Sequence, residues 1–297
     1  MRLAILADIH GNLPALETAF QEIEEDAVDG YIVAGDMVAG PNPVEVLNRL
    51  RELGAWMIRG NNENYILRFA SGEAPAWWYK ARQWAFMYWN YCQIDKDTLK
   101  FIDDLPEQRT VHITGTDPIR VVHGSPRNIS ELIYPDKDMA PLQIALRTAS
   151  EPVLIFGHTH EPWEVRENGR LAINPGSVCG TFNGKTSGSY AILSWGNGYW
   201  EVELREVHYD VALTRKAFED TGLLREGGAF AERWLYDIEM GVNTLPRFVK
   251  YAYRKAAEAG YADSPFIPDE IWERAAESFE KSLKKEIYDH RNPSPHP

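Results

Sequence analysis

The chain has 297 residues, of which 44% are hydrophobic and 25% are charged. This composition is typical of a globular protein that buries a large core in one or two domains. The 44 acidic and 31 basic residues give a formal net charge of -13, which repels the phosphate backbone of a nucleic acid. We therefore expect no binding to a nucleic-acid polymer.

The two cysteines, Cys92 and Cys179, lie far apart and outside any Cys-x-x-Cys pattern. Neither a disulfide framework nor a thiolate zinc site is therefore expected. The apolar start of the chain is too short for a secretory signal, and no uninterrupted apolar stretch approaches 18 residues. These features predict a cytoplasmic protein that does not span a membrane.

The first 60 residues alternate between strand and helix patterns. Strands are expected at 3–7, 31–34 and 56–58, with one helix from Asn12 to Ile23 and another at 44–53. Because strands joined by helices pair in parallel through right-handed crossovers, this part of the chain predicts a parallel α/β sheet.

The stretch from 76 to 92 is unusually rich in aromatic residues and apolar on nearly every face, as a helix packed on more than one side would be. One interpretation is that it belongs to the core or to an oligomer interface, and a homodimer through this segment is one hypothesis. The alternative is a cap whose rings stack on a nucleobase or an aryl group. A short helix is expected next, at 97–105.

From residue 110 the pattern becomes rich in strands, expected at 110–113, 119–122, 152–156, 163–166, 171–174, 189–195 and 199–204. A helix is expected at 141–149. Hairpin turns between several of these strands predict a second, mainly antiparallel sheet. Beyond residue 206 the pattern is helical, and 291–297 is expected to be a frayed tail.

Polar residues of metal-ligand type follow five of the predicted strands. In an open α/β sheet these strand ends meet at one crevice, and pooling them gives Asp8, His10, Asp36, Asn61, His123, His158 and His160. This set exceeds the needs of one tetrahedral ion, and its mixture of nitrogen and oxygen suits Mn, Fe, Ni or Zn. Two ions that share Asp36 would use every member.

The charge of such a site indicates its chemistry. Two divalent ions and two carboxylates leave a net charge of about +2, which attracts a phosphoryl group even on an acidic protein. A pair of ions can activate a bridging water near neutral pH and stabilise an in-line displacement. Hydrolysis at phosphorus is the natural use.

Five motifs in order carry a family resemblance: Asp8-x-His10, Gly35-Asp36, Gly60-Asn61-x-Glu63, His123-Gly124 and Gly157-His158-x-His160. Together they resemble the calcineurin-like metallophosphoesterase superfamily. Asn174-Pro175-Gly176-Ser177 is similar to the small bacterial and archaeal phosphodiesterase branch. The resemblance spans roughly residues 1 to 215.

The resemblance implies a four-layer α/β/β/α sandwich of two mixed sheets. It also implies one metal on Asp8, His10 and His160 and a second on Asn61, His123 and His158, with Asp36 bridging them. We expect residues 1–222 to form the metallophosphoesterase domain, with an aromatic helical insertion or cap at 72–105. Residues 223–297 would then be a helical C-terminal extension packed on the core.

The chain departs from the family pattern at Asn62, where many members carry a histidine that acts as general acid or orients the phosphate. Asparagine cannot donate a proton, and general acid catalysis contributes about 10² to 10⁴ in rate. We therefore expect a preference for activated phosphodiesters or phosphoanhydrides over alkyl monoesters. Arg59 and Arg127 lie beside predicted ligands and are candidates for contact with the phosphate.

The function indicated is metal-dependent hydrolysis of a small phosphoester, which could be nucleotide-like, by water bridging two divalent ions, with Mn favoured. Two alternatives stay open: a phosphomonoesterase or protein phosphatase, and a catalytically weak metal-binding scaffold. All seven ligand types are present, which argues against the scaffold, whereas the missing histidine argues for it.

Overall fold

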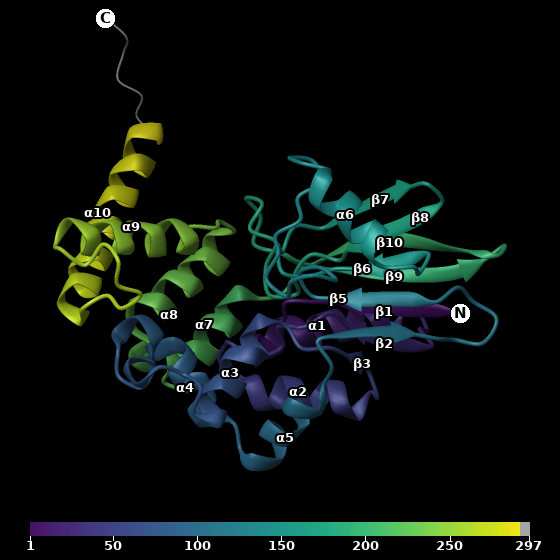
Figure 1. Cartoon of the computed structure of the whole chain (residues 1–297), viewed down its shortest axis with the longest axis horizontal. Coiled ribbons are helices and arrows are strands. Elements are labelled where there is room, and N and C mark those ends of the chain that lie inside the picture. The colour runs from purple at the N-terminus through teal and green to yellow at the C-terminus, as the bar shows by residue number, and fades with distance from the viewer. Residues whose placement is uncertain (292–297) are drawn as a thin grey trace, which may run out of the picture.

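The computed structural model describes residues 1–291 and contains two five-stranded sheets (Figure 1). The first sheet has the order β10-β9-β1-β2-β3 and the second has the order β4-β5-β6-β8-β7. The strands of the first sheet are β1 (Arg2–Leu6), β2 (Gly30–Val33), β3 (Trp56–Met57), β9 (Gly188–Gly196) and β10 (Tyr199–Val207). Those of the second are β4 (Gln108–Val111), β5 (Ile119–Val122), β6 (Val153–Ile155), β7 (Trp163–Glu167) and β8 (Arg170–Asn174).

The parallel part of the first sheet follows the predicted alternation of strands and helices. β1 pairs in parallel with β2, and β2 with β3, because the connections run through α1 (Leu13–Glu24) and α2 (Pro43–Glu52). α1 begins where the Asn12 side chain accepts a hydrogen bond from the Ala15 amide at 3.2 Å, and Pro14 occupies its first turn.

The second sheet is mixed, so the prediction that it is mainly antiparallel was wrong. β5 pairs in parallel with β6, and β6 with β8. The hairpin of β9 and β10 joins the first sheet instead, where β9 pairs antiparallel with β1. Gly188 to Leu193 is buried throughout, as an inner strand of a sheet covered on both sides is.

Three layers of apolar contact hold the sheets and helices together. Leu3 and Ile5 of β1 pack between the two sheets, while Ala4 and Leu6 face the helices beside the first sheet. α6 (Ala140–Thr148) covers the outer face of the second sheet. The prediction of a four-layer α/β/β/α sandwich of two mixed sheets is therefore confirmed.

The aromatic stretch forms three short segments and not one continuous helix. These are the 3₁₀ helices η1 (Ala76–Tyr79) and η2 (Arg82–Trp84), followed by α4 (Ala85–Gln93). Ala81 between them is extended, and this break lets Trp78 and Trp84 stack with ring centroids 3.5 Å apart. The segment packs against α3 (Asn61–Ser71) and α8 (Leu223–Met240) of the same chain.

The C-terminal part of the chain is helical, as predicted. α8, α9 (Leu245–Glu258) and α10 (Asp269–Arg291) lie beside the two sheets, with α3 and α4 next to them (Figure 1). The remaining helices are α5 (Lys96–Asp104) and α7 (Val211–Asp220). The domain boundary at 222 stays a prediction, and residues 292–297 of the expected tail lie outside the described residues.

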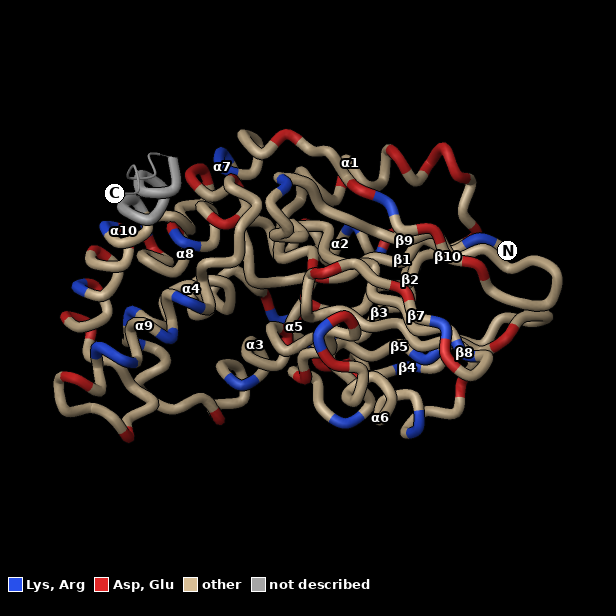
Figure 2. Tube along the Cα trace, turned by 90° about the horizontal axis from the view of Figure 1, so that it is seen from above, with Lys and Arg blue, Asp and Glu red and all other residues tan. Residues whose placement is uncertain are grey.

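The distribution of charge and the apolar content of the helices bear on the partners that the chain can bind. Acidic and basic residues are interspersed on both halves of the molecule (Figure 2). Among residues 1–291, no helix has the length and the apolar content that a bilayer crossing requires.

Candidate metal centre

The seven predicted ligands come together where strands of the two sheets end. Asp8 and His10 follow β1, Asp36 follows β2, His123 follows β5, and His158 and His160 follow β6. Asn61 is the first residue of α3. The crevice that the strand pattern predicts therefore exists, and both sheets contribute to it.

The backbone at this crevice is unusual. Five of the seven residues have a positive φ: 52° at Asp8, 48° at His10, 52° at Asp36, 68° at His158 and 60° at His160. Such a conformation costs of order 1–3 kcal/mol at a non-glycine residue and clusters at functional sites. The spacing Asp8-x-His10 predicts that both side chains point to one side of an extended strand. This prediction was wrong in its geometry: β1 ends at Leu6, and Asp8 and His10 converge through left-handed backbone.

Three ligands form a first buried group. His160 Nε2 lies 3.4 Å from Asp8 Oδ1, and His10 Nε2 lies 3.9 Å from the same oxygen. The Nε2 atoms of His10 and His160 are 3.0 Å apart. All three side chains thus point their donor atoms at one spot, as ligands of a single ion do.

A second group adjoins the first. Asp36, His123 and His158 each offer a ligand atom within 4.8 Å of the others, and Asn61 Oδ1 lies 3.1 Å from His123 Nε2. Asp36 Oδ2 is 3.3 Å from His123 Nε2 and 4.0 Å from His10 Nε2. Asp36 therefore lies close to ligands of both groups, and its bridging role stays a prediction.

An orphaned oxygen tests whether these residues fit a cation. Asp8 Oδ1 is buried and has no hydrogen-bond partner among the described residues, an arrangement that is costly unless a cation compensates it. Burial, followed by the nearby His160, lowers the pKa of His10 to about 4, so its imidazole is in the neutral, ligating form. The donor set thus fits divalent metal.

The second ring nitrogens of three histidines are held by backbone carbonyls. His123 Nδ1 lies 2.7 Å from Ala34 O, and His160 Nδ1 lies 3.3 Å from Gly180 O. His158 is turned the other way, with Nε2 3.2 Å from Ser130 O. A ring nitrogen that donates to a carbonyl carries the imidazole proton. The lone pair of the second ring nitrogen is then free to bind a metal ion.

Glu63 is a supporting residue to which the sequence assigned no role. Its buried carboxylate accepts the amides of Asp36, Met37, Val38 and Gly60 at 3.0, 2.8, 3.0 and 2.7 Å. These bonds tie the Asp36 loop to the start of α3. The available signal was the spacing Gly60-x-x-Glu63, which is that of a capping box.

Asn62 contacts the same loop. Its backbone N donates to Asp36 Oδ1 at 2.9 Å, and its side-chain Nδ2 donates to Asp36 Oδ2 at 2.5 Å. The side chain also lines the cavity over the site. The residue at the expected general-acid position is therefore engaged in holding a carboxylate.

The two arginines point to other partners. Arg59 lies in a separate depression and approaches Asp103, with 3.7 Å between Nη1 and Oδ1. Arg127 pairs with Glu131. Neither arginine is among the residues that line the cavity over the ligands, so contact with the phosphate stays a prediction for both.

The Asn-Pro-Gly-Ser motif supports the ligands from behind. Ser177 Oγ donates to the backbone oxygen of Asp8 at 2.7 Å. Asn174 Nδ2 donates to Gly157 O at 2.7 Å, next to His158. These buried bonds hold two ligand loops against each other.

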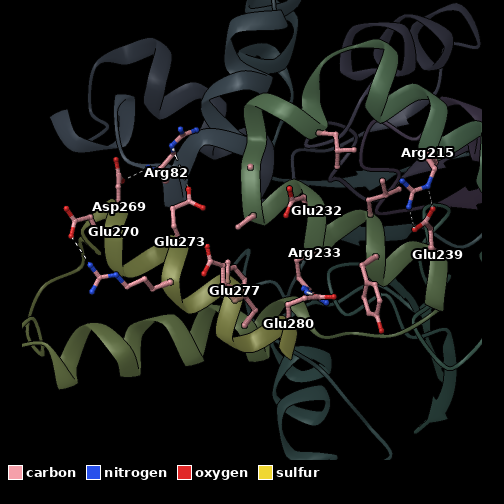
Figure 3. Close-up of a pocket in the computed structure, with 18 residues that line it drawn as sticks. Arg82, Arg215, Glu232, Arg233, Glu239, Asp269, Glu270, Glu273, Glu277 and Glu280 are labelled. Atoms are coloured by element: carbon pink, nitrogen blue, oxygen red, sulfur yellow. Dashed lines mark hydrogen bonds and ion pairs between the residues drawn. The ribbon is translucent and has the colours of Figure 1, made fainter. Parts of the chain in front are cut away.

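A cavity of about 630 Å³ opens over the ligands. It includes ligands of both groups, and most of the remaining wall is aromatic or aliphatic. A larger cavity of about 1140 Å³ lies between α8 and α10 (Figure 3). Several of its charged side chains form ion pairs, as Arg215 does with Glu239 and Arg233 with Glu280. None of the seven predicted metal ligands lines it.

A four-layer sandwich that gathers two groups of metal ligands at its strand ends is the architecture of the metallophosphoesterases. The sequence profile of the calcineurin-like phosphoesterase superfamily domain matches residues 1–198. This match covers more than half of the chain. The protein therefore belongs to the calcineurin-like phosphoesterase superfamily, as its motifs predict.

Individual relatives agree with this assignment. The chain is 27% identical to a metallophosphoesterase from Sphaerobacter thermophilus, whose crystal structure superposes with a TM-score of 0.66 over 82% of this chain and 99% of that one. It is also 27% identical to the uncharacterized protein MJ0912 of Methanocaldococcus jannaschii, over 73% of this chain and 90% of the relative. Phosphodiesterase MJ0936 of the same organism is 24% identical over 62% of this chain and 88% of its own length.

Proposed function

We propose that the protein is a metal-dependent phosphodiesterase whose seven clustered residues hold two divalent ions, with Mn favoured over Fe, Ni and Zn. The observation that carries the proposal is the position of Asp36 between two ligand groups. Such a pair of ions, when bound, supplies Lewis acidity that activates water and neutralises phosphoryl charge.

The residues of the chain then position the reaction. The negative charges of Asp8 and Asp36 would offset part of the charge of two divalent ions. The net charge of about +2 that remains suits one phosphoryl group. Glu63 accepts the Asp36 backbone amide, and Asn62 donates to both oxygens of the Asp36 carboxylate. A carboxylate held in this way needs no rearrangement when substrate arrives, which is a general source of rate enhancement.

Asn62 determines which leaving groups are favoured. Its amide donates to Asp36 and cannot release a proton. A leaving group that departs as a stable anion needs no proton, so aryl diesters and phosphoanhydrides should react better than alkyl monoesters. The naming of MJ0936 as a phosphodiesterase supports the same substrate class.

The test compares bis(p-nitrophenyl) phosphate with p-nitrophenyl phosphate, using metal-stripped protein resupplied with Mn²⁺. We expect diester cleavage that requires added metal, exceeds monoester cleavage, and falls by at least about 10²-fold in Asp36→Asn. Thermal unfolding of Asp36→Asn controls for misfolding. Equal diester cleavage with and without metal, or an undiminished rate in Asp36→Asn, would refute the proposal.

A further inference from the structure

The wall of the cavity over the metal ligands is aromatic and comes from elements far apart in sequence. Tyr65 of α3, Trp84 of η2 and Tyr134 of a loop form part of it. Phe230 and Trp234 of α8 form another part. α8 lies beyond residue 198, where the family match ends, so this chain builds its substrate cavity partly from its C-terminal helices.

Two of these rings adjoin the ligands directly. The Phe182 ring stacks on His160 with centroids 5.3 Å apart at an interplanar angle of 22°. Trp234 contacts His10 edge-on at 5.1 Å and Phe182 at 5.3 Å. The metal-binding end of the cavity is therefore next to an aromatic corner formed by Phe182 and Trp234.

The backbone of Phe182 points to a functional constraint. Its φ is 52°, which is a rare and costly conformation for a bulky side chain. The ring is half-buried and lines the cavity. The fold thus holds Phe182 in a strained backbone conformation where its ring contacts His160 and Trp234 and lines the cavity.

The charge of the wall limits the substrate further. None of the described residues that line the cavity is a lysine or an arginine, and Asp36 is the acidic one. Lys137 lies over the Tyr134 ring and pairs with Glu161, and it is not among the residues that line the cavity. A second phosphate group would therefore enter a cavity that offers it no cation beyond the metals, at the cost of losing its hydration.

From these observations, and on the basis of the proposed function, we infer that the substrate is a phosphodiester with a single negative charge and a planar aromatic ester group. The aromatic group lies in the corner of Phe182 and Trp234, where it gains apolar burial and ring contacts. An aryl ring and a nucleobase share this chemistry. Because the cavity wall has no cationic side chain, polyphosphates are excluded as substrates. Fewer phosphoanhydrides therefore remain candidate substrates.

The experiment varies the ester group and keeps the leaving group constant. Methyl, phenyl and thymidine 5′ p-nitrophenyl phosphates are cleaved by the Mn²⁺-loaded protein, and each kcat/KM is divided by the rate of hydroxide hydrolysis. We expect the phenyl or the thymidine ester to exceed the methyl ester by at least about tenfold, which is the effect of burying roughly half a ring. The better of the two identifies an aryl or a nucleoside substrate.

Substitutions in the aromatic corner test whether the preference for an aromatic ester group arises there. Phe182→Ala and Trp234→Ala should each reduce the aromatic-to-methyl ratio by about fivefold or more. Tyr261→Ala removes an exposed aromatic side chain that does not line the cavity, so its ratio should equal that of the wild type. Leu132→Lys adds a cation at an exposed position of the cavity wall and should raise kcat/KM for p-nitrophenyl phosphate.

A binding measurement separates this inference from the proposed function. Calorimetric titration of the Mn²⁺-loaded protein should show diphenyl phosphate binding at least about tenfold more tightly than dimethyl phosphate. Metal-dependent cleavage with equal ratios for all three esters would overturn the inference and leave the phosphodiesterase standing. Absence of cleavage together with selective binding of diphenyl phosphate would overturn the proposed function and support the aromatic site.

Discussion

Replacing Gly60 by alanine should damage the metal centre through a single methyl group. A Cβ at this position would lie 2.1 Å from Asp36 Oδ1 and 2.6 Å from the Asp36 amide N. Gly60 has φ -97° and ψ -171°, a conformation that alanine adopts without strain. The effect of the substitution is therefore steric and falls on Asp36.

The size of the effect follows from the distance. Cβ contacts below 3.0 Å are not tolerated, so the Asp36 carboxylate must retreat by about 3.0 - 2.1 = 0.9 Å. Overpacking of this kind costs about 1–3 kcal/mol in unfolding free energy. A displacement of that size in a bridging ligand should weaken Mn²⁺ binding by about 10- to 100-fold.

The assay combines calorimetric Mn²⁺ titration with urea unfolding of the metal-free protein. Gly196→Ala is the matched control, because a Cβ there meets no atom within 4 Å and the residue lies at the end of β9, away from the centre. The control should match the wild type in both measurements. Retention of Mn²⁺ affinity within about twofold by Gly60→Ala would refute the assignment of Asp36 as a shared ligand.

Three further substitutions test other parts of the account. Glu63→Gln removes one of two carboxylate oxygens that each accept two backbone amides, so Mn²⁺ affinity measured by titration should fall about 10- to 100-fold, while the exposed Glu73→Gln should not change it. Asn62→His should flatten the dependence of log kcat on leaving-group pKa, since it restores a proton donor; an unchanged slope would contradict this role. Although burial opposes it, hydrogen bonding with Thr110 and Arg120 lowers the pKa of Glu151 from 4.5 to about 2, so this carboxylate stabilises the fold above pH 4.5 and ceases to do so as the pH falls towards 2. Glu151→Gln should therefore lose about 1–3 kcal/mol of unfolding free energy at pH 7 and show a smaller loss on acidification than the wild type, and parallel pH profiles would count against the ion pair.

The positions of the ligands could be predicted because they follow strands. Asp8, Asp36 and His123 each come after a short apolar run, and the carboxyl ends of such strands meet in an α/β sheet. The turn geometry could not be predicted in the same way. Asp8 and His10 have a positive φ where their backbone amides donate to Gly35 O and Asp36 O, and no local pattern encodes these contacts.

Long-range pairing explains the remaining differences. The hairpin of β9 and β10 carries no local signal that selects one of the two sheets, and its pairing with β1 joins residues more than 180 positions apart. Trp234 and Phe182 carry no local signal that separates a cavity wall from a core. The contact of Trp234 with His160 exists only after α8 packs beside the strand ends.

The metal content of the protein tests the central claim most directly. Mass spectrometric analysis of Mn²⁺-loaded and desalted protein should find two Mn per chain for the wild type. It should find at most one for Asp36→Ala, because both ion positions share this residue. One Mn or fewer in the wild type, or two in Asp36→Ala, would contradict a centre in which Asp36 joins two ions.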